Sequence, residues 1–282
     1  LDMVYAPEVR GPYNYSTDVN PADGSLNDPI RNWAGIMRQI DVNNDFEATN
    51  VEFLEFWMMD PYMDDPNHNG GRLVLNLGQI SEDLLPDNAI AMENGLAANN
   101  TELGNIDTTD WGRVPLALPP NQNFSNDEEE RTRQDVGLDG LNNEDERLFY
   151  GGDFSNFLQQ MEGILGVNSQ AYQRILADPS SDDFVHYNDD NYVTQGVGII
   201  QRYSSFNGQQ GNSPASDNAS NSLGRTQGTN IPDSEDINQN GGLATSESYY
   251  EYQIDLKPGR LDRGQNFVVD IRDTTVVLPD NS

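Results

Sequence analysis

The sequence contains no cysteine, a single lysine (Lys257), two histidines and no long hydrophobic run. Without cysteine the chain cannot form disulfides, thiolate zinc sites or a thiol nucleophile, so hard, oxygen-ligated ions are the metals it could bind. No apolar stretch approaches the roughly 20 residues that a membrane-spanning helix needs. No signal segment opens the chain either, so we expect a soluble piece of a longer protein or a mature fragment.

Positive charge is also scarce. Only 15 Lys and Arg residues stand against 47 Asp and Glu residues, which gives a net charge of −32. Binding to nucleic acid or to an anionic membrane needs clustered basic residues, so both are disfavoured as partners. A chain with this much negative charge repels itself unless cations neutralise part of it, and we therefore expect cations among its partners.

The chain has 282 residues, of which 35% are hydrophobic, enough for one large core or two modest ones. Residues 50–62 are apolar on both faces, which is typical of a central strand, and we expect them to form a hairpin with residues 72–80. Residues 72–80, 248–256 and 266–278 alternate apolar and polar positions, as half-buried strands do. The sequence thus predicts a mainly β fold, a jelly-roll-like β-sandwich, as a single β-rich segment over residues 1–282.

Helical patterns are fewer. Residues 155–166 and 169–178 have apolar side chains at helical spacing behind a serine, which predicts two short helices. A serine followed by acids at 81–87 predicts one further helical turn. Residues 97–135 read mostly as loop, and residues 204–235 are poor in apolar side chains, which predicts a long surface loop. We expect long loops and two or three short helices around the sandwich.

The stretch "DINQNGGLATSE", residues 236–247, has the spacing of a calcium loop. Loops of the EF type take ligands from places 1, 3, 5, 7, 9 and 12 and have glycine at place 6. The corresponding groups here are Asp236, Asn238, Asn240, the Gly242 carbonyl and Glu247, with Gly241 at place 6. Only two of these ligands are acids, so the predicted ion is a weakly bound, structural Ca²⁺.

A second, weaker match is "DVGLDGLNNEDE", residues 135–146. Its ligands would be Asp135, Asp139, the Leu141 carbonyl and Glu146 at places 1, 5, 7 and 12. Gly137 offers no side-chain ligand at place 3, which weakens the match. For both stretches the alternative is a polar turn, because Asn, Asp and Gly stabilise turns without any metal.

Catalytic motifs are scarce. His68 and His186 stand in polar loops without a partner at a catalytic spacing. Glu52 and Glu55 are three residues apart in a predicted strand, so they would point to opposite faces and could not act as an acid and base pair. No phosphate-binding glycine loop, nucleophile elbow or metallohydrolase motif is present. The sequence therefore predicts a protein that is not an enzyme.

Several longer phrases carry a family resemblance. They are "RGPYNY", "DFEATNVEFLEFWMMDPY", "LVLNLGQISEDLLPD", "WGRVP", "QDVGLDGL", "DPSSDDF" and "PDSEDINQNGGLATSESYYEY", in this order between about residues 5 and 256. Together they resemble the SprA/Sov family, the outer-membrane translocon of the bacterial type IX secretion system, which is linked to gliding motility. The combination of "EFLEFWMMDPY" with "NLGQISEDLLPD" is long enough to be specific.

The resemblance implies a role in protein export. Proteins of this family are very large outer-membrane β-barrels that work with partner barrel and plug proteins and pass secreted cargo. This chain would be an extracellular or periplasmic part of such a polypeptide, a cap or insert beside the remainder of the barrel. The resemblance implies no catalysis and no cofactor, and it assigns no role to any residue.

A different class of protein also fits the patterns. A secreted, calcium-dependent carbohydrate-binding β-sandwich would have the same strands and Asp-rich loops, with Tyr and Trp side chains lining a sugar-binding face. Binding to a glycan array would favour this alternative, and the length of the native reading frame around residues 1 and 282 would separate the two hypotheses.

Overall fold

The structure, a computed structural model, describes residues 3–40, 46–48, 50–58, 67, 69–85, 87, 89–91, 93, 106–115, 124–213, 235–238 and 240–272. Contacts divide the chain into two compact units. Unit 1 comprises Leu1–Gln39 and Glu82–Ala244, and unit 2 comprises Ile40–Ser81 and Thr245–Ser282.

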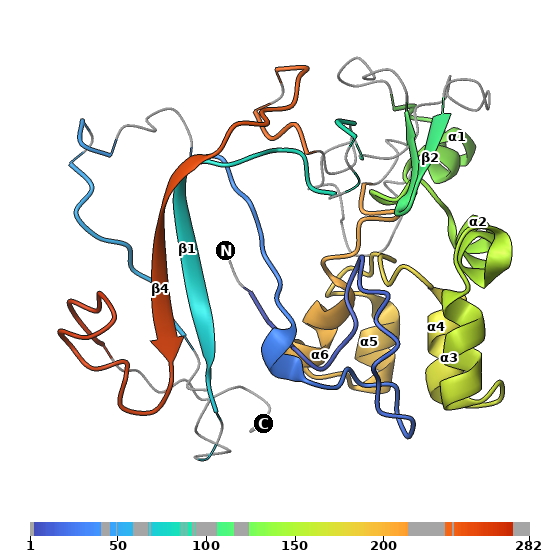
Figure 1. Ribbon diagram of the computed structural model, residues 1–282, viewed down its shortest axis with the longest axis horizontal. Coiled ribbons are helices and arrows are strands. Elements are labelled where there is room, and N and C mark those ends of the chain that lie inside the picture. The colour runs from blue at the N-terminus through green and yellow to red at the C-terminus, as the bar shows by residue number, and fades with distance from the viewer. Residues whose placement is uncertain are drawn as a thin grey trace. The chain divides into compact units, whose positions relative to one another are not determined.

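Unit 2 contains an antiparallel two-stranded sheet of β1 (Gly71–Gln79) and β4 (Ser248–Leu256), drawn side by side in Figure 1. The register places Leu75 opposite Tyr252. Both strands follow the alternation seen in the sequence, so these two elements are confirmed. The predicted hairpin is wrong, because β1 pairs with β4 and the described residues 50–58 form no strand beside it.

Residues 50–58 form no strand, although the sequence predicts a central one there. Phe53 and Trp57 are 67% and 64% exposed. A strand that is apolar on both faces needs a covering layer on each side, and the described part of unit 2 supplies no such layers around this segment. Residues 266–272, the described part of the last predicted strand, are not a strand either. Residues 59–62 and 273–278 lie outside the described residues.

Unit 1 is built from short helices and one small hairpin. The hairpin joins β2 (Ile106–Thr109) and β3 (Gly112–Pro115) in an antiparallel sheet. The α-helices among its described residues are α1 (Glu128–Gln134), α2 (Asn143–Leu148), α3 (Phe157–Leu165), α4 (Gln170–Ala177), α5 (Asp190–Gln195) and α6 (Ile199–Arg202). The described residues of this unit also contain the 3-10 helices η1 (Pro29–Arg31) and η5 (Tyr203–Ser205) and the π-helical turn η4 (Phe149–Asp153).

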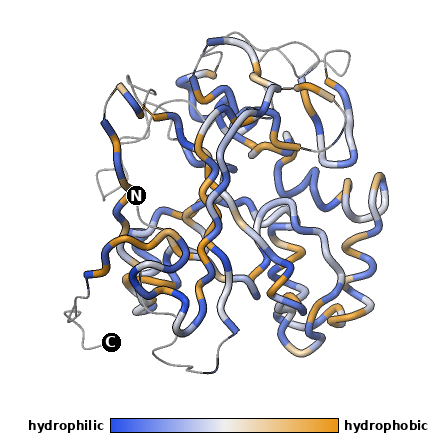
Figure 2. The backbone as a smooth tube through the Cα atoms, turned by 60° about the vertical axis from the view of Figure 1, so that its left-hand side comes forward, coloured by the Kyte–Doolittle hydropathy of each residue, from blue (hydrophilic) through white to orange (hydrophobic). Residues whose placement is uncertain are grey.

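The core of unit 1 lies around α3 and α4, which confirms the two predicted helices. The apolar positions of α3 recur at helical spacing and bury Phe157, Leu158, Met161 and Leu165. The Ser169 side chain accepts the Tyr172 N–H and caps α4, as the sequence predicts. Figure 2 shows short hydrophobic stretches alternating with hydrophilic ones along the tube, so the core gathers side chains from many separate short segments.

The prediction of a mainly β sandwich is wrong. The described residues contain four strands in two separate two-stranded sheets, against six α-helices. The α-helices that the sequence patterns missed are short, and three of them, α1, α2 and α5, start at the capping residues Asp127, Asn142 and Asp189. These same residues favour turns, so a helix of one or two turns reads as a polar loop.

Two smaller predictions have different outcomes. The described residues at 81–85 are not helical, so the predicted turn of helix there is wrong. The surface loop predicted over 204–235 stays a prediction, because residues 214–234 lie outside the described residues. Within its described part, Gly208 and Ser213 are buried.

Candidate metal centre

Three buried carboxylates from separate parts of unit 1 meet at one point. Asp139 lies in the turn before α2, Glu146 lies within α2, and Asp182 lies in the segment after α4. One carboxylate oxygen from each lies within 4.8 Å of the others. Their exposed fractions are 1%, 0% and 0%, respectively. Acidic side chains are rarely buried this completely without a partner.

The turn that carries Asp139 is fixed by its backbone. Gly137 and Gly140 have φ angles of 71° and 66°, which other residues rarely adopt. The Asp139 carbonyl accepts the Arg113 N–H at 2.8 Å, and a Cβ added at Gly140 would lie 2.1 Å from the Arg113 carbonyl oxygen. The Leu141 N–H donates to Asp139 Oδ1 at 2.9 Å. The β2–β3 hairpin therefore packs directly on this turn and holds the aspartate in place.

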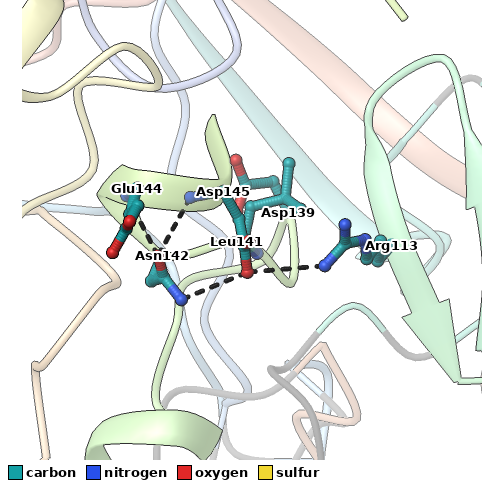
Figure 3. A network of polar contacts seen from close by, with 6 residues as sticks. All are labelled: Arg113, Asp139, Leu141, Asn142, Glu144 and Asp145. Atoms are coloured by element: carbon teal, nitrogen blue, oxygen red, sulfur yellow. Dashed lines mark hydrogen bonds and ion pairs between the residues drawn. The ribbon is translucent and has the colours of Figure 1, made fainter. Parts of the chain in front are cut away.

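Helix α2 begins at once after the turn, as Figure 3 shows. Asn142 Oδ1 accepts the N–H groups of Glu144 and Asp145, each at 3.0 Å, and so caps the helix. The Arg113 guanidinium forms an ion pair with Asp145 at 3.4 Å. The cap and ion pair fix the start of α2, and Glu146 follows on its buried side.

The third carboxylate is positioned by the segment after α4. The Asp178 carboxylate accepts the N–H groups of Asp182 and Asp183 at 3.1 and 3.3 Å. The Asp182 carbonyl accepts the Gln210 N–H at 2.9 Å. Ser180 links this segment to the other two acids, because its N–H donates to Glu146 Oε2 at 3.0 Å and its hydroxyl donates to Asp139 Oδ2 at 2.6 Å.

The remaining oxygens of the cluster lack partners. Among the described residues, Glu146 Oε1 and both carboxylate oxygens of Asp182 have no hydrogen-bond donor. Burial, together with the neighbouring Asp139 and Glu146, raises the pKa of Asp182 to about 10. Burial likewise raises the pKa of Glu146 to about 9 and that of Asp139 to about 7. Such a cluster can either hold protons or bind a hard cation.

Aromatic side chains close one side of the cluster. The Tyr15 hydroxyl donates to the Tyr150 hydroxyl at 2.6 Å and lies 3.2 Å from the Ser180 hydroxyl oxygen. The Tyr150 hydroxyl is 3.2 Å from the Trp111 carbonyl oxygen, to which it donates. The rings of Tyr15 and Tyr150 are stacked with centroids 4.5 Å apart. These aromatic side chains therefore cover one side of the carboxylate cluster.

The structure brings together only part of the set predicted over 135–146. Asp139 and Glu146 meet, whereas the Asp135 carboxylate accepts the N–H and hydroxyl of Ser213 at 3.1 and 2.7 Å. The Leu141 side chain is fully buried in the core. Sequence reasoning missed Asp182. Its only sequence signal is the acidic run "SSDDF", and nothing in that run indicates a contact with α2.

The predicted loop at 236–247 forms a hydrogen-bonded polar turn at its start. Asp236 is buried, and its carboxylate accepts the N–H groups of Asn240 and Gly241 at 3.0 and 2.8 Å. The Glu82 carboxylate, which the sequence did not single out, accepts the Asn238 amide and the Ala244 N–H at 3.0 and 2.9 Å.

The remaining predicted ligands of this loop differ in their surroundings. Gly242 donates its N–H to Asn240 Oδ1 at 2.9 Å. Glu247 is exposed and belongs to unit 2, whereas Asp236 belongs to unit 1. These bonds hold the turn as the polar-turn alternative expects, and calcium at this loop stays a prediction.

The other titratable residues singled out in the sequence form no constellation among the described residues. The His186 ring stacks on Tyr187 with centroids 4.5 Å apart, and its Nδ1 accepts the Asn188 N–H at 3.2 Å. Glu52 and Glu55 are exposed. His68 lies outside the described residues. That the chain is not an enzyme stays a prediction.

In the described part of the chain, the helices are too short or too polar to span a membrane. Comparison with curated proteins found no match. Residues 156–282 match the model of the SprA_N family, described as a motility related/secretion protein. The match includes α3, α4, Asp182 and β4, and it confirms the resemblance seen in the sequence. Residues 156–282 of this chain are therefore similar to the SprA_N family of motility-related and secretion proteins.

Proposed function

We propose that the chain is a structural, non-enzymatic segment of an outer-membrane translocon for type IX protein secretion. It would be a cap or periplasmic insert that lies beside the remainder of the barrel, on the extracellular or periplasmic side. The observation that carries this proposal is the match of residues 156–282 to a family of secretion and motility proteins. Partner barrel and plug proteins and the secreted cargo are the partners that such a segment would meet.

The geometry of unit 1 supports a structural role over a catalytic one. Catalytic carboxylates must reach a substrate, whereas Asp139, Glu146 and Asp182 are at most 1% exposed. The same acids tie the turn before α2, α2 itself and the segment after α4 together through Ser180. Loss of this cluster would thus disturb the fold of unit 1 rather than remove a reaction.

The proposal includes Ca²⁺ as a structural ion. A secreted or outer-membrane segment meets extracellular calcium, and weak sites suit that concentration range. The loop 236–247 supplies Asp236 and its neighbouring amides for such an ion. The carbohydrate-binding alternative has less support, because it needs a β-sandwich and the described residues contain only two small, separate sheets.

The test is a pair of matched substitutions in helix α3, made in the chromosomal gene. Met161 is fully buried in the core, whereas Ile164 in the same helix is 38% exposed. We expect Met161→Asp to unfold unit 1, to retain cargo proteins in the periplasm and to abolish spreading on agar. Ile164→Asp should secrete cargo normally. Protease digestion of whole cells and of lysates measures whether each variant segment is folded and on which side it is accessible.

The secretion assay has a clear contrary outcome. If the Met161→Asp segment is digested as an unfolded chain while cargo still reaches the medium at the parent level, the segment has no role in secretion. If both variants fold and both block secretion, the effect lies at the surface of α3 and the structural role is wrong.

A further inference from the structure

We propose that Asp139, Glu146 and Asp182 bind one divalent cation, and that Ca²⁺ is the ion that fits best. This centre differs from the loop pattern of residues 135–146, because it uses a ligand from outside the loop and leaves Asp135 out. The inference concerns the stability of unit 1 and does not depend on the role in secretion.

The first argument is the set of oxygens without donors. Ser180 satisfies one oxygen each of Asp139 and Glu146, while Glu146 Oε1 and both oxygens of Asp182 have no donor among the described residues. No ion pair between described residues includes any of the three acids. A buried carboxylate without a partner is costly, and a cation supplies the missing partner for several of them at once.

The second argument is the place that Asp182 occupies. In a calcium loop of the EF type, place 3 supplies a side-chain ligand, and in residues 135–146 this place is Gly137. A Cβ added at Gly137 would lie 2.0 Å from Asp182 Oδ2 and 3.8 Å from Asp139 Oδ1. The carboxylate of Asp182 therefore fills the space where the place-3 side chain would be. Asp182, which is distant in the sequence, thus takes the position of the ligand that residues 135–146 lack at place 3.

The third argument is size. A Ca²⁺ ion lies about 2.3–2.6 Å from each oxygen, so three oxygens around it can be about 4.0–4.5 Å from one another, whereas around Mg²⁺, at about 2.0–2.1 Å, they can be only about 3.5 Å from one another. The three ligand oxygens lie within 4.8 Å of one another. The wider spacing that Ca²⁺ allows is closer to this limit, so binding of Ca²⁺ requires less movement of the three side chains than binding of Mg²⁺.

Hydrogen bonds from neighbouring residues hold the three carboxylates in position before a cation binds. Ser180 donates to Asp139 Oδ2 and Glu146 Oε2, and its hydroxyl lies 3.2 Å from the Tyr15 hydroxyl. Asp178 fixes the backbone of Asp182. Such outer partners commonly hold metal ligands in place. A bound cation would then join the β2–β3 hairpin, α2 and the segment after α4 into one rigid block.

The test uses the full chain, isothermal titration calorimetry with CaCl₂ or MgCl₂, and thermal unfolding with and without a chelator. At a Ca²⁺ concentration of about 100 times Kd we expect the melting temperature of unit 1 to rise by about 5–10 °C. Asp182→Asn and Glu146→Gln should each weaken Ca²⁺ binding at this centre at least about tenfold. Glu144→Gln, an exposed glutamate in the same helix, is the matched control and should bind as the parent does.

Two comparisons keep the outcome specific to this centre. Asp182→Asn removes a buried charge without changing shape, so in chelator it should be at least as stable as the parent and remain testable. Asp236→Asn removes the acid of the other predicted loop and should leave this binding event intact. The proposal is wrong if titration of the parent with Ca²⁺ gives no heat of binding and Ca²⁺ leaves its melting temperature unchanged. It is equally wrong if Asp236→Asn or Asp135→Asn abolishes the rise in melting temperature caused by Ca²⁺ while the Asp182→Asn variant still shows that rise.

Discussion

The close approach of Asp182 to Gly137 gives a sharp prediction for Gly137→Ala. Gly137 has a φ of 71°, and its new Cβ would lie 2.0 Å from Asp182 Oδ2. A non-glycine residue in this backbone region lowers stability by about 1–2 kcal/mol. Overpacking of a filled site lowers it by about a further 1–3 kcal/mol. We therefore expect a loss of about 2–5 kcal/mol in the free energy of unfolding.

Gly196→Ala is the matched control. Gly196 has a φ of 64° in the left-handed region, but nothing lies within 4 Å of its added Cβ. This variant carries the backbone cost alone, about 1–2 kcal/mol. The difference between the two variants thus isolates the contact with Asp182. Gly163→Ala, within α3 and also in open space, should instead raise stability by about 0.5–1 kcal/mol.

The assay is urea unfolding of the full chain in chelator, followed by far-ultraviolet circular dichroism. The six described α-helices all belong to unit 1, so the helical signal reports that unit. Equal losses for Gly137→Ala and Gly196→Ala would refute the placement of Asp182 against the turn. In added Ca²⁺ the gap should widen, because a displaced Asp182 can no longer contribute a ligand.

Three further predictions follow from burial and capping. Burial and the neighbouring Glu235 raise the pKa of Glu93 to about 10, so its folded pKa exceeds the unfolded one, and stability falls as pH rises above about 4.5. Glu93→Gln should therefore gain melting temperature over the parent at pH 8 but not at pH 4.5, and an equal gain at both would contradict this. Asn142→Ala removes the cap of α2 and should cost about 1 kcal/mol in urea unfolding, and an unchanged midpoint would show that the cap is unimportant. Trp57→Ser should leave the melting temperature unchanged because Trp57 is 64% exposed, whereas a drop comparable with that of a core substitution would place it in a core.

The sequence by itself determined the elements whose burial follows a local period. The spacing of apolar residues around Met161 predicts α3, the serine before α4 predicts its start, and the alternation in β1 and β4 predicts both strands. It also placed Asp139 and Glu146 at ligand spacing within one loop, and its longer phrases indicated the family that residues 156–282 match. All of these depend on residues that are neighbours in the chain.

Only the tertiary structure decided which distant segments meet. A periodic pattern records which face of a segment is apolar, but it does not say which segment covers that face. For this reason β1 pairs with β4 instead of residues 50–62, and Phe53 and Trp57 are exposed where a central strand was predicted. In the same way, Asp182 completes the carboxylate cluster from beyond α4. A cluster of ligands is defined by distance in space, and chain folding sets that distance independently of spacing along the sequence.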